Sequence, residues 1–330
     1  MKRIIAVLTL AVVLAGLPLH ADDGADAISA GGIVMMGREP RISMAKEVLQ
    51  ISLGKVIVDY DFYNGSSNSI ITGIAFPIPD YSVNLGEIDP EWQGFEDFRL
   101  WVNGSPVTYK IQARAMVKGK DLTQLLTPLH IDVASFGHAT LNEGSPEIGK
   151  LTNAQRERLQ KAGLIDRDGV PLWTVQKKYY WTLSFPAHGR VHIRHEYTPV
   201  VGSLNSIRYG MGPDPDASSV KELRTFCLDP PLSSTLQGVV RNDKEDAWYS
   251  YVDFILTTAN TWKTPIGQFT LIVTRPHLKG DLADYVSFCW DRPVKKIDDD
   301  HFSATATNFV PTHELRIGFF HVVKNPLSPP

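Results

Sequence analysis

The sequence predicts a mainly β protein, with two antiparallel β-sandwich domains and a short helical insertion in the first. Three observations lead to this fold class. From about residue 45 onward, apolar and polar side chains alternate with a period of two, which is typical of strands with one buried face. Turn residues separate these runs at short intervals, as in antiparallel sandwiches. A polar stretch within residues 119–170 interrupts the pattern and is typical of a surface insertion.

Residues 1–21 have the composition of a secretory signal sequence. Lys2 and Arg3 are followed by an apolar run over residues 4–17 that is too short to span a bilayer stably, and Ala21 ends a small-residue cleavage site. We therefore expect a mature chain that begins at Asp22 and is periplasmic or secreted. A retained N-terminal anchor is the alternative, although no stop-transfer pattern follows. No later segment is long and apolar enough for a transmembrane span.

The charge balance limits the kinds of partner. The formal net charge of the whole chain is −3, and removal of Lys2 and Arg3 with the signal makes it more negative. A nucleic-acid-binding protein needs a basic surface, so we expect no nucleic-acid partner.

The first predicted domain covers residues 22–203. Asn103-Gly104 suits a type I′ turn and predicts a hairpin. In the insertion, Thr152 and Gln155 form a capping box and Gly163 suits a helix C-terminus, so a helix is expected between them. A shorter helix is expected over residues 121–126. After the insertion, an aromatic-rich pair of strands predicts a long hairpin that turns at residues 186–189. The expected strands are 55–63, 69–77, 98–102, 106–112, 173–185 and 191–197.

The second predicted domain covers residues 204–324, after a boundary rich in Gly, Ser and Pro. Ser219 and Glu222 form a capping box that starts a short helix toward Cys227, and Pro230-Pro231 ends it. The expected strands are 248–258, 268–275, 285–290, 302–307 and 314–323. The tail at residues 325–330 is rich in proline and is expected to be disordered.

Cys227 and Cys289 are the only 2 cysteines of the chain. Because an exported protein meets oxidising conditions, we expect them to form a disulfide, which would stabilise the fold by roughly 4 kcal/mol. The alternatives are two buried free thiols or a redox site, although the close Cys-x-x-Cys spacing of a redox pair is absent.

Several motifs resemble a bacterial exported family known as domain of unknown function 4424. The most specific is Trp262-Lys263-Thr264-Pro265-Ile266-Gly267, which we expect to form a structural corner because Pro265 restricts φ and Gly267 permits close backbone approach. The resemblance implies an envelope or secreted protein without an assigned reaction, so it supplies no catalytic residues. The first domain is also weakly similar to the vault-protein inter-alpha-trypsin type of sandwich. The other motifs are Ala30-Gly31-Gly32, Ile42-Ser43-Met44, Val58-x-Tyr60-x-Phe62-x-Asn64, Phe76-Pro77-Ile78-Pro79, Phe185-Pro186, His195-x-Tyr197-x-Pro199 and Phe288-Cys289.

The sequence lacks the common catalytic, nucleotide-binding and metal-binding motifs, so we expect no cofactor and no metal. His188, His192 and Glu196 could donate metal ligands, but a solvated charged face is the simpler interpretation. His195 is expected to face the core between aromatic side chains, with hydrogen bonds to its ring.

Two acidic segments have similar alternatives. The acids around Trp92 could serve as a carboxylate pair for glycoside hydrolysis, but an acidic surface loop is the simpler interpretation. Asp298-Asp299-Asp300 lacks the spacing of a calcium loop and is expected to form a solvated turn. The acids around Trp92 are Asp89, Glu91, Glu96 and Asp97.

One surface is the best candidate for binding. Tyr180 and Lys178 point away from the core side of their strand, and His192 and Arg194 do the same on the strand expected beside it. An outward aromatic ring among cations suits an anionic or carbohydrate partner, while an ordinary solvated sheet face is the alternative.

The function best supported by these patterns is a non-enzymatic binding or assembly module in the bacterial envelope, with an envelope protein or glycan as its partner. The alternative is a secreted hydrolase that acts on envelope glycans or peptides. A pocket that holds two carboxylates or a Ser/His pair would favour the hydrolase.

Overall fold

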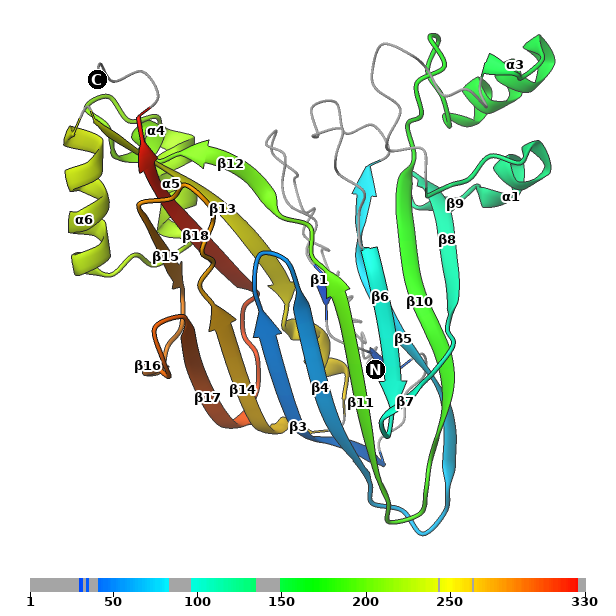
Figure 1. Ribbon diagram of the computed structural model, residues 1–330. Helices are drawn as coiled ribbons and strands as arrows, with labels where there is room; N and C mark the ends of the chain where they lie inside the picture. Colours follow the sequence, from blue (N-terminus) through cyan, green and yellow to red (C-terminus); the bar gives the residue numbers. More distant parts are fainter. Residues whose placement is uncertain are drawn as a thin grey trace, which may run out of the picture.

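The computed structural model describes residues 30–31, 34–35, 41–82, 96–134, 149–242, 244–262 and 264–325. Within them the protein is mainly β, as predicted, with three sheets and several short helices (Figure 1). The predicted signal sequence and residues 326–330 of the predicted tail lie outside the described residues.

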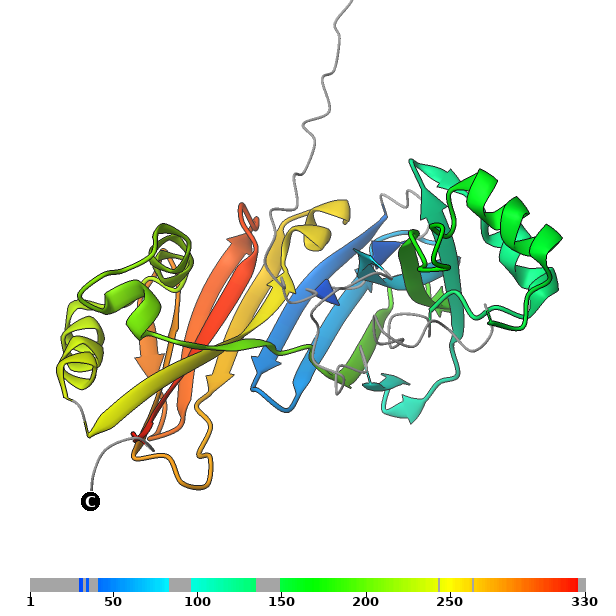
Figure 2. The ribbon, with the colours of Figure 1, turned by 90° about the horizontal axis from the view of Figure 1, so that it is seen from above.

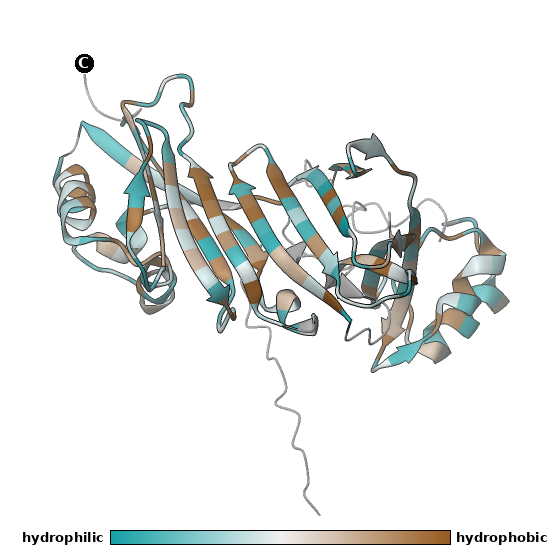
Figure 3. Cartoon of the chain, turned by 90° about the horizontal axis from the view of Figure 1, so that it is seen from below, coloured by the Kyte–Doolittle hydropathy of each residue, from teal (hydrophilic) through white to brown (hydrophobic). Residues whose placement is uncertain are grey.

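The largest sheet has 8 strands, in the order β16-β17-β14-β3-β4-β11-β6-β7. Figure 3 shows hydrophobic and hydrophilic residues alternating along its strands, which is the pattern that predicted them. The sheet runs through the middle of the molecule and supplies one side of the core. Its strands are β3 (Ile42–Ile51), β4 (Val56–Asn64), β6 (Glu96–Val102), β7 (Ser105–Pro106), β11 (Arg190–Thr198), β14 (Ile266–Thr274), β16 (Val294–Lys296) and β17 (His301–Phe309).

Two smaller sheets pack against this large sheet. The second sheet has the order β2-β5-β10-β8-β9, and in the third the order is β1-β13-β18-β15 with β12 beside β13. One core cluster contains Leu271 of the large sheet, Phe76 of the second and Phe319 of the third, so all three sheets bury side chains together. Their strands are β1 (Ala30–Gly31), β2 (Val34–Met35), β5 (Ile70–Ser82), β8 (Lys110–Val117), β9 (Lys120–Asp121), β10 (Thr174–Phe185), β12 (Gly202–Ser206), β13 (Glu245–Ile255), β15 (Ala283–Phe288) and β18 (Leu315–Lys324).

A parallel pairing of β3 with β14 joins the two halves of the chain. Leu49 lies opposite Leu271 in this register, and the Trp262 ring packs on Phe62 with a centroid distance of 4.3 Å. The large sheet is therefore continuous across position 203. Whether residues 22–203 and 204–324 behave as separate domains stays a prediction.

The prediction that β10 and β11 pair with each other as an aromatic hairpin is wrong. β10 pairs with β5 and β8 in the second sheet, whereas β11 pairs with β4 and β6 in the large sheet. The turn at residues 186–189 carries the chain from one layer to the other. The period-two pattern showed which face of each strand is buried, but it carries no information about which strand lies alongside.

The turn at Asn103-Gly104 is confirmed. Both residues have positive φ, 49° and 78°, and they connect β6 to β7. The strand expected over 106–112 is divided, because β7 ends at Pro106 and the chain then enters the second sheet as β8, which begins at Lys110.

The α-helices lie at the two ends of the molecule (Figure 2). In α3 (Asn153–Ala162) the predicted capping box and the left-handed Gly163 are both present. Near it lie α1 (Thr123–Leu126) and the 3-10 helix η1 (Thr127–Leu129). At the other end lie α4 (Arg208–Met211), α5 (Ala217–Arg224) and α6 (Pro230–Arg241), and a further 3-10 helix, η3 (Thr257–Thr261), follows β13.

Two helix limits in the second half differ from the prediction. The N-cap of α5 is Asp216, so Ser219 lies inside the first turn and donates its backbone N–H to the cap. Pro230-Pro231 begins α6, with Asp229 as the N-cap. Proline suits the first helical turn because the N–H that it lacks has no partner there. The Asp-Pro-Pro sequence was thus a start signal.

Candidate functional site

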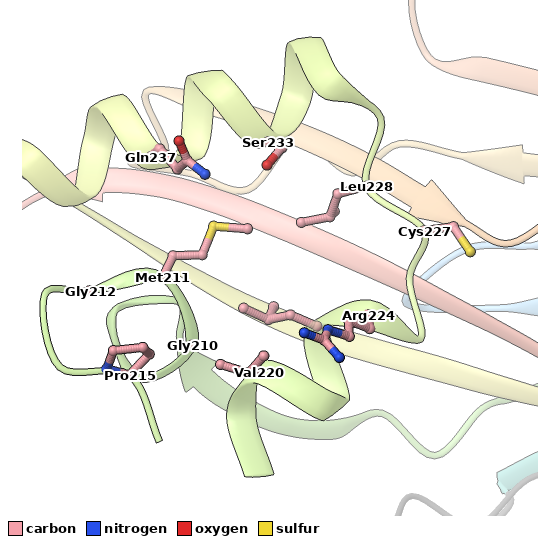
Figure 4. A pocket seen from close by; sticks show the side chains of 11 residues that line it. Gly210, Met211, Gly212, Pro215, Val220, Arg224, Cys227, Leu228, Ser233 and Gln237 are labelled. Carbon is pink, nitrogen blue, oxygen red and sulfur yellow. The ribbon is translucent and has the colours of Figure 1, made fainter. Parts of the chain in front are cut away.

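An open pocket lies among α4, α5 and α6, on the face of the third sheet that points away from the large sheet (Figure 4). Its volume is about 540 Å³, within the range of roughly 300–1,000 Å³ typical of small-molecule sites. The lining is formed by Gly210, Met211, Gly212, Pro215, Val220, Leu223, Arg224, Cys227, Leu228, Ser233 and Gln237.

Helix caps and one close approach set the shape of this pocket. Asp216 accepts a hydrogen bond from the Ser219 N–H at 2.8 Å, and Asp229 accepts one from the Leu232 N–H at 2.7 Å, so both long helices have fixed starts. At Gly210 a Cβ would lie 2.5 Å from Leu223 Cδ1 and 3.1 Å from the Ser219 backbone, so glycine lets α4 pack on α5 without displacing the Leu223 side chain. The helices therefore form a defined wall rather than a loose cover.

The predicted disulfide is confirmed and lies beside the pocket. Cys227 is bonded to Cys289, with Cα atoms 4.9 Å apart, and it ties the connection between α5 and α6 to the chain just after β15. The Ser287 hydroxyl donates to the Phe226 carbonyl oxygen at 2.8 Å and strengthens the same attachment. One wall of the pocket is thus covalently anchored to the third sheet.

The pocket wall combines apolar side chains with a comparable share of polar surface. Arg224 is the single charged residue among the lining residues described above, and no ion pair of its side chain occurs within the described part of the chain. The nearby Glu222 accepts a hydrogen bond from the Tyr249 hydroxyl at 2.6 Å and so points toward the sheet. In Figure 4, Ser233 and Gln237 project from α6 toward the side of the pocket that carries Met211 and Val220. The pocket thus offers apolar walls, one cation and two neutral hydrogen-bonding groups.

The structure does not bring the four predicted binding residues together. Tyr180 and Lys178 are on β10 in the second sheet, while His192 and Arg194 are on β11 in the large sheet. Each pair is half-buried and faces away from the core, so the two pairs lie on different outer faces of the sandwich. A role of these residues in binding stays a prediction.

Carboxylates balance the cations on the outer face of β11. Arg194 Nη1 lies 2.9 Å from Asp59 Oδ2, and the His192 ring lies within 3.2 Å of Asp59 and 3.0 Å of Asp61. Glu196 is 3.6 Å from Lys55 and 3.5 Å from Arg99. These pairs agree with a solvated charged face.

His195 faces the core, as predicted, but its expected hydrogen bonds are absent. The residue is 0% exposed, its ring centroid lies 4.9 Å from that of Phe76, and neither ring nitrogen has a hydrogen-bond partner among the described residues. Because burial disfavours the charged ring, the pKa of His195 falls to about 3. The histidine is therefore neutral over the physiological range.

The remaining predicted segments have mixed outcomes. Asp298 accepts hydrogen bonds from the backbone N–H groups of Asp300 and His301, both at 2.9 Å, which confirms a turn. Trp262 is buried, and a Cβ at Gly267 would meet the Ala45 carbonyl oxygen at 2.6 Å, so the corner is closely packed as expected. Lys263 and residues 89–92 lie outside the described residues.

A family model described as Domain of unknown function (DUF4424) matches residues 21–317. The chain belongs to this family. The matched residues include the pocket lining, both cysteines of the disulfide and strands of all three sheets. The similarity of the first domain to the vault-protein type of sandwich stays a prediction.

Comparison of this DUF4424 chain with curated proteins gives no match. Among solved structures, it is similar to a Legionella pneumophila protein described as a candidate nutrient-binding protein, with a TM-score of 0.45 and 15% identity over 89% of this chain and 71% of that one. Similarity at this level does not identify a ligand for the DUF4424 chain. None of the helices among its described residues is long and apolar enough to cross a membrane.

Proposed function

We propose that this DUF4424 protein is an extracytoplasmic binding protein whose pocket takes a small carboxylate with a short apolar body. The observation that carries the proposal is the pocket lining, in which apolar side chains lie beside one exposed arginine, Arg224, that has no ion pair among the described residues. Arg224 can form two parallel charge-assisted hydrogen bonds to a carboxylate. Met211 and Leu223 can cover the apolar body.

The chemistry of the lining favours binding over hydrolysis. A hydrolase needs a nucleophile with a base beside it, or a pair of carboxylates. The lining contains the Ser233 hydroxyl, but its described residues place no histidine or acid next to it. The disulfide beside the pocket supports an oxidising compartment, in agreement with the predicted export signal.

A homologous series of linear carboxylates tests the proposal by isothermal titration calorimetry. Each additional buried CH₂ should tighten binding roughly fourfold until the pocket is full, because burial of one CH₂ contributes about 0.8 kcal/mol. The matching alcohols and amines should bind more weakly because they cannot pair with Arg224. Flat affinity along the series would contradict the proposal.

Two variants on α5 distinguish binding in the pocket from general attraction of an anion to the cations of the helix. Arg224→Gln should weaken carboxylate binding by about 10–100-fold, the loss expected for a charge-assisted hydrogen bond. Lys221 is a cation in the same last turn of α5 but does not line the pocket. The variant Lys221→Gln should therefore bind the carboxylate with the affinity of the parent. Equal affinities for the parent and Arg224→Gln would refute the site. Turnover of short-chain nitrophenyl esters, lost on Ser233→Ala, would instead support the hydrolase.

A further inference from the structure

A second cluster of polar side chains lies at one end of the third sheet, away from the pocket lining. Asp284 on β15 is the register partner of His321 on β18, and Asp281 comes from the loop before β15. His321 Nδ1 lies 2.7 Å from Asp284 Oδ1 and 3.1 Å from Asp281 Oδ2. One donor atom from each residue falls within 4.8 Å of the others. Two strands and a loop thus bring three potential metal ligands together.

These three side chains are nearly removed from solvent. Their exposed fractions are 5% for His321, 5% for Asp284 and 10% for Asp281. Two buried carboxylates face a single imidazole, so the cluster has an excess of negative charge even when the ring is protonated. Buried charge of this kind is costly unless it is paired or coordinates a metal.

The nearest arginine does not neutralise the two carboxylates. Arg275 donates from Nη1 to the backbone carbonyl oxygen of Asp284 at 3.4 Å and from Nη2 to Asp300 at 3.1 Å. Two further histidines nearby are engaged by other acids, since His277 pairs with Asp300 and His301 with Asp298. Within the described part of the chain, the negative charge of Asp281 and Asp284 is therefore balanced only by His321.

We propose that Asp281, Asp284 and His321 bind a divalent transition-metal ion, with Zn²⁺ as the best-suited ion. One imidazole nitrogen and two carboxylate oxygens form a ligand set that zinc accepts, whereas calcium and magnesium prefer oxygen ligands alone. Ligand atoms around a tetrahedral ion at about 2.0–2.2 Å lie about 3.3–3.6 Å apart, slightly farther than the 2.7 Å and 3.1 Å between His321 Nδ1 and the two carboxylates, so small side-chain movements would admit the ion. The ion joins the loop after β14 to β15 and β18, and it stabilises the folded state because the unfolded chain does not hold these ligands together.

The test uses the purified protein without a histidine tag, after treatment with a chelator. Zinc titration by calorimetry should give one site per chain, and a zinc excess should raise the melting temperature. Cobalt should give visible absorption bands at the same stoichiometry. Absence of zinc binding by the folded parent would overturn the proposal and leave a hydrogen-bonded Asp-His-Asp cluster.

Variants assign the site to these residues. Asp284→Asn and Asp281→Asn should each weaken zinc binding by roughly 100-fold or more, since loss of even an outer partner of a metal ligand costs about 10–100-fold. Asp281 lies in the loop, so its variant leaves the strand register intact, and circular dichroism checks the fold of both. The controls His277→Ala and His301→Ala should bind like the parent. Loss of binding in the controls, with binding retained in Asp281→Asn, would place the metal elsewhere and refute the assignment.

Discussion

Glu47 on β3 is an acid in the core, and its burial should make stability depend on pH. The residue is 2% exposed, and its Oε2 has no hydrogen-bond partner in the part of the chain that the structure describes. Burial raises its pKa from 4.5 to about 8, so the side chain is protonated in the folded protein at neutral pH. Since the folded pKa is above the unfolded one, the stability contributed by Glu47 is fully present below pH 4.5 and is lost as the pH rises toward 8.

His195 acts in the opposite direction. Its folded pKa, about 3, lies below the unfolded value of 6.5, so its contribution is fully present above pH 6.5 and is lost as the pH falls toward 3. Each of these two pKa shifts corresponds to roughly 5 kcal/mol of folding stability, at 1.36 kcal/mol for each pKa unit. Between pH 4.5 and 6.5 the loss of stability from Glu47 with rising pH cancels the gain from His195. The expected profile is a plateau in that window with a fall on both sides.

The variant Glu47→Gln isolates the alkaline side of this profile. The neutral amide has the shape of the protonated acid, so the free energy of unfolding of the variant should exceed that of the parent by about 1 kcal/mol at pH 5.5 and about 4 kcal/mol at pH 8. Urea unfolding with the disulfide intact measures both values. Glu157→Gln, on an exposed position of α3, is the matched control and should follow the parent at every pH. Parallel profiles for the parent and Glu47→Gln would refute the reasoning.

Three further predictions concern packing, redox state and the outer faces. Trp262→Ala should lower the free energy of unfolding by about 3–5 kcal/mol, because it removes a buried ring packed on Phe62; urea unfolding measures this, and an unchanged midpoint would contradict it. Thiol titration of the unfolded, unreduced protein should find no free sulfhydryl. The double variant Cys227→Ser with Cys289→Ser should bind carboxylates more weakly, because the pocket wall loses its covalent anchor. Full affinity of the parent after reduction would show that the disulfide does not shape the site. Tyr180 and Arg194 lie in different sheets, so the variants Tyr180→Ala and Arg194→Ala should affect partner capture from a periplasmic extract independently, with the melting temperature nearly unchanged. If the double variant retained every captured partner, neither outer face would be a binding surface.

Burial was predictable from the sequence because it depends on local alternation. In β4, Val58, Tyr60 and Phe62 are buried, while Asp59 and Asp61 face outward, as their spacing indicated. Strand pairing was not predictable in the same way. The turns after β4 and β10 have the residues of a hairpin turn, yet both carry the chain between layers, because the choice of neighbour depends on contacts far away in the sequence.

The candidate sites were missed for related reasons. The sequence did contain the start signal of α6, Asp229 before two prolines, but it was interpreted as a helix end, and so the helices that wall the pocket were not anticipated. For the metal cluster no local signal exists. Asp284 and His321 meet only through the register of β15 with β18, which sequence spacing does not reveal.

The parallel pairing of β3 with β14 has a consequence for the order of folding. The strand that carries Leu49 is synthesised early, and its partner strand with Leu271 follows much later. Pairings between distant segments close large loops and form slowly. The early strand therefore keeps an open edge until the last third of the chain has been made, which delays completion of the large sheet. Release of a truncated chain that ends near residue 203 should expose that edge to other chains and promote aggregation.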